Sequence, residues 1–222
     1  PLRVGFIGSY GNRWANITLS NSDFVLVLGS RLDVRQTGSQ VKEFKGNKTI
    51  YHVDCEKGEI NNRISGCVVV NSTLQSFLTS IIKYIGKKEF QTRKDWINEI
   101  NSLKNLFPDY KENSKISGIN PNNFIHKLSK FSKKASVFVA DVGQHQMWAA
   151  QSLELCKNQR FITSGGMGSM GFGLPASIGA AFTKSPSPIV LIAGDGGFQS
   201  NIQELQTVVH HTLPIKIVIL NN

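Results

Sequence analysis

Residues 189–222 read IVLIAGDGGFQSNIQELQTVVHHTLPIKIVILNN, and this stretch decides the fold. The apolar runs at 189–193 and 215–220 predict two strands. Between them, Phe198, Ile202, Leu205 and Val209 recur at helical spacing and predict one helix with a single apolar face. A strand–helix–strand unit of this kind favours two parallel strands that lie side by side in one sheet.

Polar groups follow both strands. Asp195 comes after the first and Asn222 after the second, and 24 residues separate Gly194-Asp195-Gly196 from Asn221-Asn222. Because the carboxyl ends of parallel strands meet at one edge of a sheet, we expect the two side chains to lie together. Hard oxygen ligands suit Mg2+ beside a diphosphate, and the following helix N-terminus offers free N–H groups. The alternative is a plain strand–turn–helix with an Asn-rich loop, but GDG paired with NN at this spacing favours the ligand site.

The rest of the chain alternates strands and helices in the same way. Residues 4–7, 24–28, 49–54 and 68–70 predict strands of a first unit, and 24–28 is a continuous apolar run typical of a strand covered on both faces. Residues 136–141, 161–164, 188–193 and 215–220 predict the strands of a second unit, whose first helix starts at Asn120-Pro121. We predict an α/β protein with two parallel-sheet domains, 1–85 and 119–222, joined by a helical linker at 86–118.

Composition restricts the class of protein. The chain has 222 residues, 40% of them hydrophobic, and no apolar run long enough for a membrane span. Three widely spaced cysteines favour a reducing compartment over a disulfide framework or a zinc site. The net charge of +10 comes largely from lysines scattered over 83–134, which favours a solvated surface over nucleic-acid binding. The chain begins with Pro1 and has no signal peptide, so we expect a piece cut at both ends of a longer protein.

Two further loops follow predicted strands of the second unit. The loop at 164–176 has five glycines in nine positions, 165–173, and Met170 is its large flexible apolar side chain. Such a loop brings backbone groups close to a flat ligand, although a tightly packed helix entry would also use small residues. Gln144 and His145 follow the strand at 136–141 and are good diphosphate donors. A lone histidine is more often structural. A ligand-binding role is favoured for His145 because the other loops leave the same sheet edge.

The first unit also has polar residues at three strand ends, near Gly8, Arg31 and Asp54. A parallel sheet with such ends is a candidate nucleotide-binding domain. Arg31 or Arg35 would pair with a phosphate, and Asp54 would accept a ribose hydroxyl. A structural domain with surface arginines explains the same residues equally well.

These motifs together resemble the acetohydroxyacid synthase (acetolactate synthase) large catalytic subunits, a branch of the thiamin-diphosphate-dependent enzymes. Residues 143–151 read GQHQMWAAQ, as in that branch, and 164–175 are similar to its SGGLGAMGFGLP. The NIQEL at 201–205 after GDG matches as well. The resemblance covers nearly the whole chain. It implies that 1–85 is the later part of a Rossmann-type central domain and that 119–222 is the first part of the thiamin-diphosphate-binding domain.

The resemblance implies a set of cofactor contacts. Asp195 and Asn222 would hold Mg2+, and Met170 would be the apolar wedge that bends the cofactor. The complete set for thiamin diphosphate is Gln144, His145, Gly168, Ser169, Met170, Asp195, Gly196, Gly197 and Asn222. No catalytic residue is assigned in this chain, because the glutamate of the family lies on an N-terminal domain that these residues do not include.

The resemblance also implies FAD in the central domain, where it has no redox role in the family. The matching positions are Ile7, Gly8, Ser9, Tyr10, Gly29, Ser30, Arg31, Leu32, Asp33, Asp54 and Cys55. The chain departs from the family here, with GSYG at 8–11 in place of GMHG and LDVRQTG at 32–38 in place of FDDRVTG. Thiamin diphosphate and Mg2+ are therefore the firmer expectations.

The implied function is a carboligase that decarboxylates pyruvate and joins the remaining two-carbon unit to a second 2-oxo acid, which forms 2-acetolactate for branched-chain amino acids. The alternatives are a related carboligase or decarboxylase with another acceptor, such as a keto sugar, and a nucleotide-binding regulatory module without catalysis. We expect a homodimer or tetramer with the active site at the interface, a small regulatory subunit as partner, and a cytoplasmic or plastid-stromal location. Neither nucleic acid nor membrane is an expected partner, and the 222 residues alone should be inactive.

Overall fold

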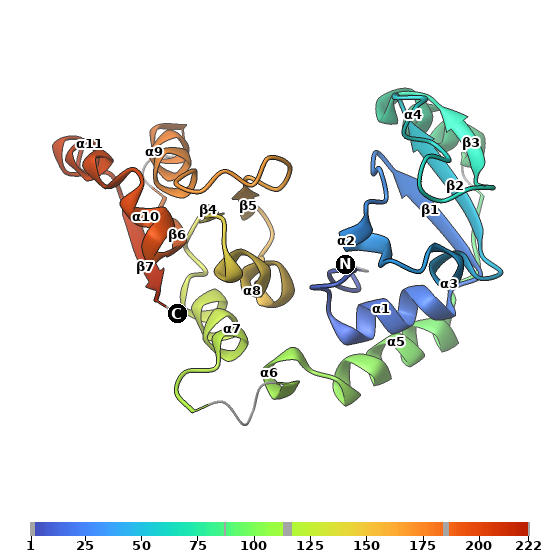
Figure 1. The fold of residues 1–222 in the computed structure, drawn as a ribbon, viewed down its shortest axis with the longest axis horizontal. Helices are drawn as coiled ribbons and strands as arrows, with labels where there is room; N and C mark the ends of the chain where they lie inside the picture. The colour runs from blue at the N-terminus through green and yellow to red at the C-terminus, as the bar shows by residue number, and fades with distance from the viewer. Residues whose placement is uncertain (1–2, 87, 113–116, 184–186, 222) are drawn as a thin grey trace. The chain divides into compact units, whose positions relative to one another are not determined.

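The computed structural model describes residues 3–86, 88–112, 117–183 and 187–221, and the chain divides into two compact units, Pro1–Pro108 and Asp109–Asn222 (Figure 1). Each unit is an α/β fold on a parallel sheet, which confirms the predicted fold class. Within the described ranges, no helix combines the length and apolar character that a bilayer crossing requires. The linker at 86–118 remains a prediction as a separate element, since its helix α5 (Lys94–Leu106) belongs to the first unit and α6 (Asp109–Glu112) to the second.

The sheet of the first unit has the order β1-β2-β3 with parallel pairing throughout. Its elements are α1 (Arg13–Asn21), β1 (Phe24–Leu28), α2 (Val34–Thr37), α3 (Val41–Lys45), β2 (Thr49–Asp54), β3 (Val68–Asn71), α4 (Leu74–Ile85) and α5. Helices α1 and α5 contact each other and α4 contacts β2, so segments far apart in sequence cover the strands (Figure 1).

One face of this sheet carries the core of the unit, in which Val27 and Ile50 pack with Ile64. On the other face Phe24 is 53% exposed, and Leu26 and Leu28 are exposed as well. The prediction that 24–28 is covered on both faces is therefore wrong for the described residues. Exposure alternates along β1, as it does in a strand with one covered face.

The strand predicted at 4–7 is also wrong, because residues 3–7 pair with no strand among the described residues. Side chains of the α1 region bond this backbone instead. Trp14 Nε1 donates to the Val4 carbonyl at 2.8 Å, and the Phe6 N–H donates to Asn12 Oδ1 at 2.9 Å. These bonds satisfy groups that a sheet would otherwise have to pair.

The sheet of the second unit has the order β5-β4-β6-β7, again parallel throughout. After α6 its elements are α7 (Pro121–Phe131), β4 (Val137–Ala140), α8 (Gln144–Ser152), β5 (Arg160–Thr163), α9 (Gly173–Thr183), β6 (Ile189–Gly194), α10 (Asp195–Gln199), the 3-10 helix η1 (Ile202–Glu204), α11 (Leu205–His210) and β7 (Ile215–Leu220). Strands β4 and β6 are buried along their whole length, which explains their continuous apolar sequences.

Two apolar clusters cover the two faces of this sheet. On one face Ile125 of α7 and Ala149 of α8 pack against Phe138, which is fully buried. On the other face Leu174 and Ile178 of α9 pack against the second cluster. Both cores hold the central strands rigidly, so the loops at their carboxyl ends start from fixed positions.

The single helix predicted between the last two strands is wrong, because α10, η1 and α11 replace it. Phe198 and Leu205 pack on the core, whereas Ile202 is 47% and Val209 is 73% exposed. The 3-10 turn at 202–204 shifts the helical register, so the four apolar residues no longer share one face.

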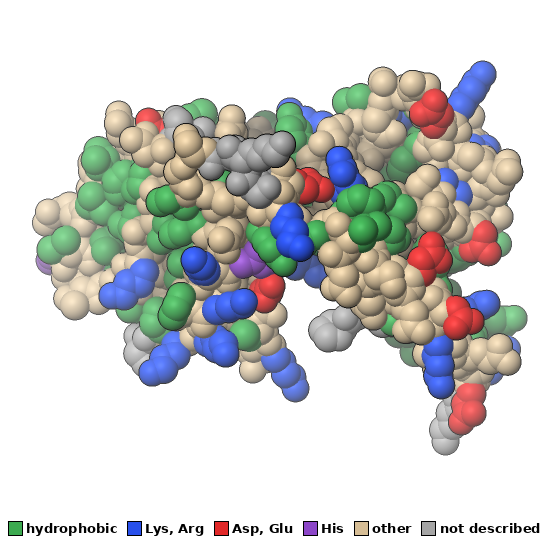
Figure 2. All heavy atoms as spheres, turned by 90° about the horizontal axis from the view of Figure 1, so that it is seen from below, with side chains coloured by type: hydrophobic (Ala, Val, Ile, Leu, Met, Phe, Trp, Pro, Cys, Tyr) green, Lys and Arg blue, Asp and Glu red, His purple; other side chains and the backbone are tan. Residues whose placement is uncertain are grey.

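Lys and Arg side chains gather in one part of the surface. On the face seen in Figure 2, several of them lie close together at the lower left, among apolar and polar side chains and with few acidic ones. The solvated surface that the sequence favoured for the lysines stays a prediction.

Candidate cofactor-binding site

The three ligand loops of the second unit leave the same edge of its sheet. Ala140 lies beside both Thr163 and Ile192 in the register, and Gly194 lies beside Leu220. Strands β4 and β5 are followed at this edge by loops that lead into α8 and α9, whereas β6 leads directly into α10, and the tight turn at 194–197 where they join is called the third loop. The arrangement that the sequence predicted for Asp195 and the following strand end is present, and Asn222 itself lies outside the described residues.

The first loop places His145 in a buried position against two glycines. The imidazole is 2% exposed, and a Cβ at Gly143 or Gly194 would lie 2.7 Å or 3.2 Å from its Cε1. Burial lowers the pKa of His145, although the Asp141 charge and a hydrogen bond to the Asp141 backbone oppose it. Nε2 is buried and has no hydrogen-bond partner among the residues that the structure describes. A buried polar atom without a partner is rare, and it fits a ligand that would supply one.

The glycine loop lies open above the sheet edge. Gly168 adopts a left-handed φ of 66°, and the Ser169 N–H donates to Ser164 Oγ at 3.2 Å. Met170 is 60% exposed, and its Cε lies 3.8 Å from the position of a Cβ at Gly196. The Met170 side chain therefore extends from the second loop to the third. Met170 is the residue for which the family resemblance predicted the role of apolar wedge.

The third loop carries Asp195, the predicted metal ligand that lies within the described residues. Asp195 is exposed at the first position of α10, and Gly196 beside it is exposed as well. Within the described ranges, no group of three His, Cys, Asp or Glu side chains would hold a metal on its own. A cation at Asp195 would thus need the amide at 222 and the oxygens of a bound ligand to complete its shell.

The sequence prediction missed Asp141 and Asn201. Asp141 is 1% exposed, and its carboxylate accepts from the N–H groups of Val142 at 2.8 Å and Gly171 at 3.1 Å. A Cβ at Gly197 would overlap the same carboxylate. Asn201 Nδ2 donates to the Gly171 carbonyl at 2.7 Å. The signal for Asp141 was its place directly after a buried strand.

Two of the three predicted strand ends of the first unit, at 29–33 and 54–55, lie at the carboxyl edge of its sheet, whereas the turn at 7–10 follows no strand, so that part of the prediction is wrong. The Ser9 N–H donates to the Arg35 carbonyl at 2.7 Å, which joins the 7–10 turn to α2. The Gly29 N–H donates to the Val53 carbonyl at 2.9 Å, next to Asp54. Tyr10 and Cys55 are exposed, Ile7 and Ser30 are half-buried, and Gly8 has a left-handed φ of 100°.

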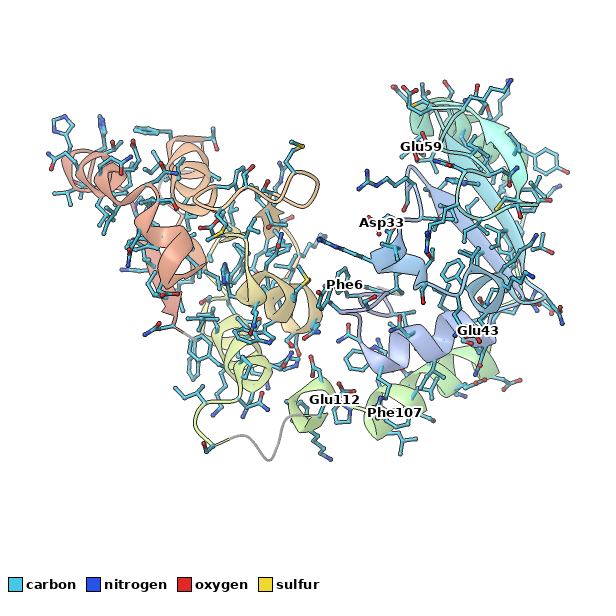
Figure 3. All side chains as sticks on the ribbon, viewed as in Figure 1. Phe6, Asp33, Glu43, Glu59, Phe107 and Glu112 are labelled. Carbon is cyan, nitrogen blue, oxygen red and sulfur yellow. The ribbon has the colours of Figure 1, made fainter. Side chains whose placement is uncertain are left out.

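Several of these side chains already have partners. Asp33 lies at the start of α2 (Figure 3) and caps this helix, because its carboxylate accepts from the Arg35 N–H at 2.8 Å. The Arg31 guanidinium lies 3.5 Å from the same carboxylate. Leu32 is 4% exposed in the core, so only its backbone faces the loop. Two pockets border the loops. One is about 430 Å3 and includes Gly8, Ser9 and Gln36, and the other is about 560 Å3 and includes Arg31, Asp33 and Glu59.

A parallel α/β unit with three ligand loops at one sheet edge defines a cofactor-binding domain. Residues 141–222 match the family model described as thiamine pyrophosphate enzyme, C-terminal TPP binding domain. Residues 1–81 match the one described as thiamine pyrophosphate enzyme, central domain. The chain belongs to the thiamine pyrophosphate enzymes.

Within this family the chain is similar to acetolactate synthase large subunits. It is 37% identical to the one from Cyanidium caldarium, over 100% of the chain and 38% of the relative. It is 36% identical to the one from Buchnera aphidicola subsp. Schlechtendalia chinensis, over 100% and 39%. It is 33% identical to the isozyme 1 large subunit from Escherichia coli (strain K12), also over 100% and 39%. The predicted resemblance is confirmed, and the chain spans 38–39% of these curated relatives.

Proposed function

We propose that the full-length protein is a thiamin-diphosphate-dependent carboligase that decarboxylates pyruvate and joins its two-carbon unit to a second 2-oxo acid. The observation that carries this proposal is the convergence of three loops at one sheet edge, around a buried histidine whose Nε2 has no partner. Similarity to acetolactate synthase large subunits over the whole chain supports 2-acetolactate as the product.

The described residues fit this cofactor. Gln144, His145, Gly196 and Gly197 would hold the diphosphate, Gly168 to Met170 would hold the aminopyrimidine, and Asp195 would hold Mg2+ together with Asn222, which lies outside the described residues. When bound, thiamin diphosphate supplies a carbon nucleophile for the keto carbon and takes up the electrons left by decarboxylation.

The residues of the chain bind and orient rather than react. The exposed backbone at Gly196 leaves room for a phosphoryl oxygen, since the Met170 methyl group is the nearest atom to a Cβ there. The Nε2–H of His145 would donate a hydrogen bond to the diphosphate. A nearby anion favours the protonated imidazole, so it would oppose the lowering of the His145 pKa by burial. Met170 would exclude water on the opposite side of the cofactor.

The test uses the full-length protein with and without Mg2+. We expect Mg2+-dependent binding of thiamin diphosphate in calorimetry, and its loss in Asp195→Ala. Asp95→Ala, an exposed carboxylate on α5, is the matched control and should bind normally. Product analysis with pyruvate alone, and with pyruvate plus a keto sugar, then identifies the acceptor. Binding that survives Asp195→Ala contradicts the proposed site.

We also propose that the first unit binds FAD. The loop at 29–33 and residues 54–55 follow neighbouring strands, the turn at 7–10 is bonded to α2, and the exposed guanidinium groups of Arg31 and Arg35 would suit a diphosphate. Purified full-length protein should carry yellow flavin absorbance that is released on denaturation. A colourless protein that takes up no added FAD contradicts this proposal.

Assembly into a dimer or tetramer, with a small regulatory subunit and a cytoplasmic or plastid-stromal location, is a further proposal. Its support is the exposure of Met167, at 91%, and Met170 on the cofactor loop, because another chain would cover them. Light scattering of the full-length protein should give at least twice the monomer mass.

A further inference from the structure

A single residue, Gly171, is hydrogen-bonded to segments that follow β4 and β6. Gly171 is buried, and its N–H donates to Asp141 Oδ2 at 3.1 Å while its carbonyl accepts from Asn201 Nδ2 at 2.7 Å. Asp141 begins the loop after β4, Gly171 belongs to the loop after β5, and Asn201 follows α10 after β6. One residue of the middle loop is therefore held from both sides.

Packing leaves little freedom around these two bonds. Gly171 has a left-handed φ of 83°, and a Cβ there would lie 2.8 Å from Asn201 Nδ2 and from Ser200 Cβ. A Cβ at Gly173 would lie 2.9 Å from Asp141 Cβ. Distances this short exclude any larger residue without movement of backbone.

The Asp141 carboxylate draws the loops together electrostatically. It is buried, and it accepts hydrogen bonds from two loop N–H groups, those of Val142 and Gly171. A buried carboxylate is costly without such bonds, and charge-assisted bonds are about twice as strong as neutral ones. Separation of Gly171 from Asp141 is therefore opposed more strongly than loss of an ordinary backbone bond.

We propose that Asp141 and Asn201 are positioning residues that fix the Met170–Gly171 backbone relative to the Gly196–Gly197 turn. Met170 is largely exposed, so its own packing holds it weakly, and the adjacent Gly171 peptide sets where its side chain begins. The pair thus determines the spacing between the aminopyrimidine side and the diphosphate side of the cofactor site. This inference rests on the proposed binding of thiamin diphosphate.

The two hydrogen bonds that hold Gly171, from its N–H to Asp141 and from Asn201 to its carbonyl, are called the clamp. The test removes the Asn201 bond with almost no change in the shape of the side chain. Asn201→Asp replaces the donor by an oxygen that faces the Gly171 carbonyl, and Gln206→Glu makes the same chemical change at an exposed position of α11. In the full-length protein with saturating Mg2+, we expect Asn201→Asp to raise the Kd of thiamin diphosphate about tenfold or more, as loss of supporting bonds around a ligand commonly does. Gln206→Glu should leave the Kd unchanged.

Inorganic pyrophosphate separates positioning from general damage. It would touch only the diphosphate side, so its competition against thiamin diphosphate should give the same Kd in Asn201→Asp and wild type. Hydrogen exchange of 165–171 without cofactor should be faster in Asn201→Asp. Asn201→Ala removes the donor without adding a repulsive oxygen, and it should weaken cofactor binding and speed exchange in the same way as Asn201→Asp. It replaces Asn201→Asp in the test if that variant does not fold.

Three results overturn the inference. Wild-type cofactor affinity and exchange in both variants would overturn the clamp while the proposed function stands. If Asn201→Asp weakened the binding of pyrophosphate and of thiamin diphosphate equally, Asn201 would have only a structural role. A wild-type protein that binds no thiamin diphosphate overturns the clamp and the proposed function together.

Discussion

The polar cluster around His126 gives a prediction that does not depend on the cofactor. His126 Nε2 lies 2.9 Å from Asp109 Oδ1, and Nδ1 lies 2.9 Å from Glu154 Oε1. Ser152 Oγ donates to the other Asp109 oxygen at 2.5 Å. Helix α6 is thereby tied to α7 and to the end of α8. We expect His126→Gln to destabilise the second unit in a pH-dependent way.

The magnitude follows from the exposure of each partner. Asp109 is 8% exposed in its side chain, and a hydrogen bond between charged groups contributes about 1.5–3 kcal/mol. Glu154 is 60% exposed, so its ion pair contributes about 0–1 kcal/mol. Together the loss is about 2–4 kcal/mol, or about 4–16 °C in Tm for a chain of this size.

The pKa shifts define the pH window. The hydrogen bond to Asp109 raises the pKa of His126 above its ordinary 6.5, against the opposite effect of burial. This stabilisation is complete below 6.5 and is lost as the pH rises through the raised value. Burial raises the pKa of Asp109, but the bonds from His126 and Ser152 outweigh it and lower the pKa below 3.8. That stabilisation is complete above 3.8 and is lost as the pH falls through the lowered value.

The assay is urea unfolding of the chain, followed by circular dichroism from pH 3 to pH 9. The difference between wild type and His126→Gln should be largest between 3.8 and 6.5 and should shrink on both sides. His210→Gln, an exposed histidine on α11, is the control and should change stability by less than about 0.5 kcal/mol. A difference that stays constant across this range would refute the reasoning.

Three further substitutions and one thiol reaction test the packing. Gly197→Ala places a methyl group on the Asp141 carboxylate, so it should cost about 1–3 kcal/mol in urea unfolding and abolish cofactor binding. Gly179→Ala in α9, where no atom lies within 4 Å of the added Cβ, should instead stabilise by about 0.5–1 kcal/mol, and destabilisation there would contradict the packing. Phe138→Ala, at a fully buried site, should cost about 3–5 kcal/mol in the same measurement, and a loss below 1 kcal/mol would mean the core is loosely packed. A thiol reagent should modify the exposed Cys55 and Cys156 quickly and Cys67 slowly, because burial raises the pKa of the Cys67 thiol, and three equal rates would contradict that burial.

Local pattern predicted most of the elements correctly. The continuous apolar runs at 137–140 and 189–194 belong to strands buried on both faces, and Asn120 caps α7 as the Asn-Pro pair indicated. The same reasoning failed at 4–7, where Asn12 and Trp14 compete for the backbone. It also failed at 202–204, where a 3-10 turn interrupts the apolar periodicity. At 4–7, side chains six and ten residues along the chain outweighed the strand preference of the backbone segment.

The sequence by itself determined the class of this protein, because its glycine loops, the GDG…NN spacing and the strand–helix alternation are local patterns. The tertiary structure decided how those loops are held together. Asp141 and Gly171 are 30 residues apart, as are Gly171 and Asn201, and no periodicity connects such positions. His145 is a second example. The sequence identified it as a candidate diphosphate donor, but its burial against Gly143 and Gly194, and the lack of a partner for Nε2 among the described residues, arise only in the folded chain. Hydrogen bonds between loops depend on where the sheet places them, so only the folded chain reveals them.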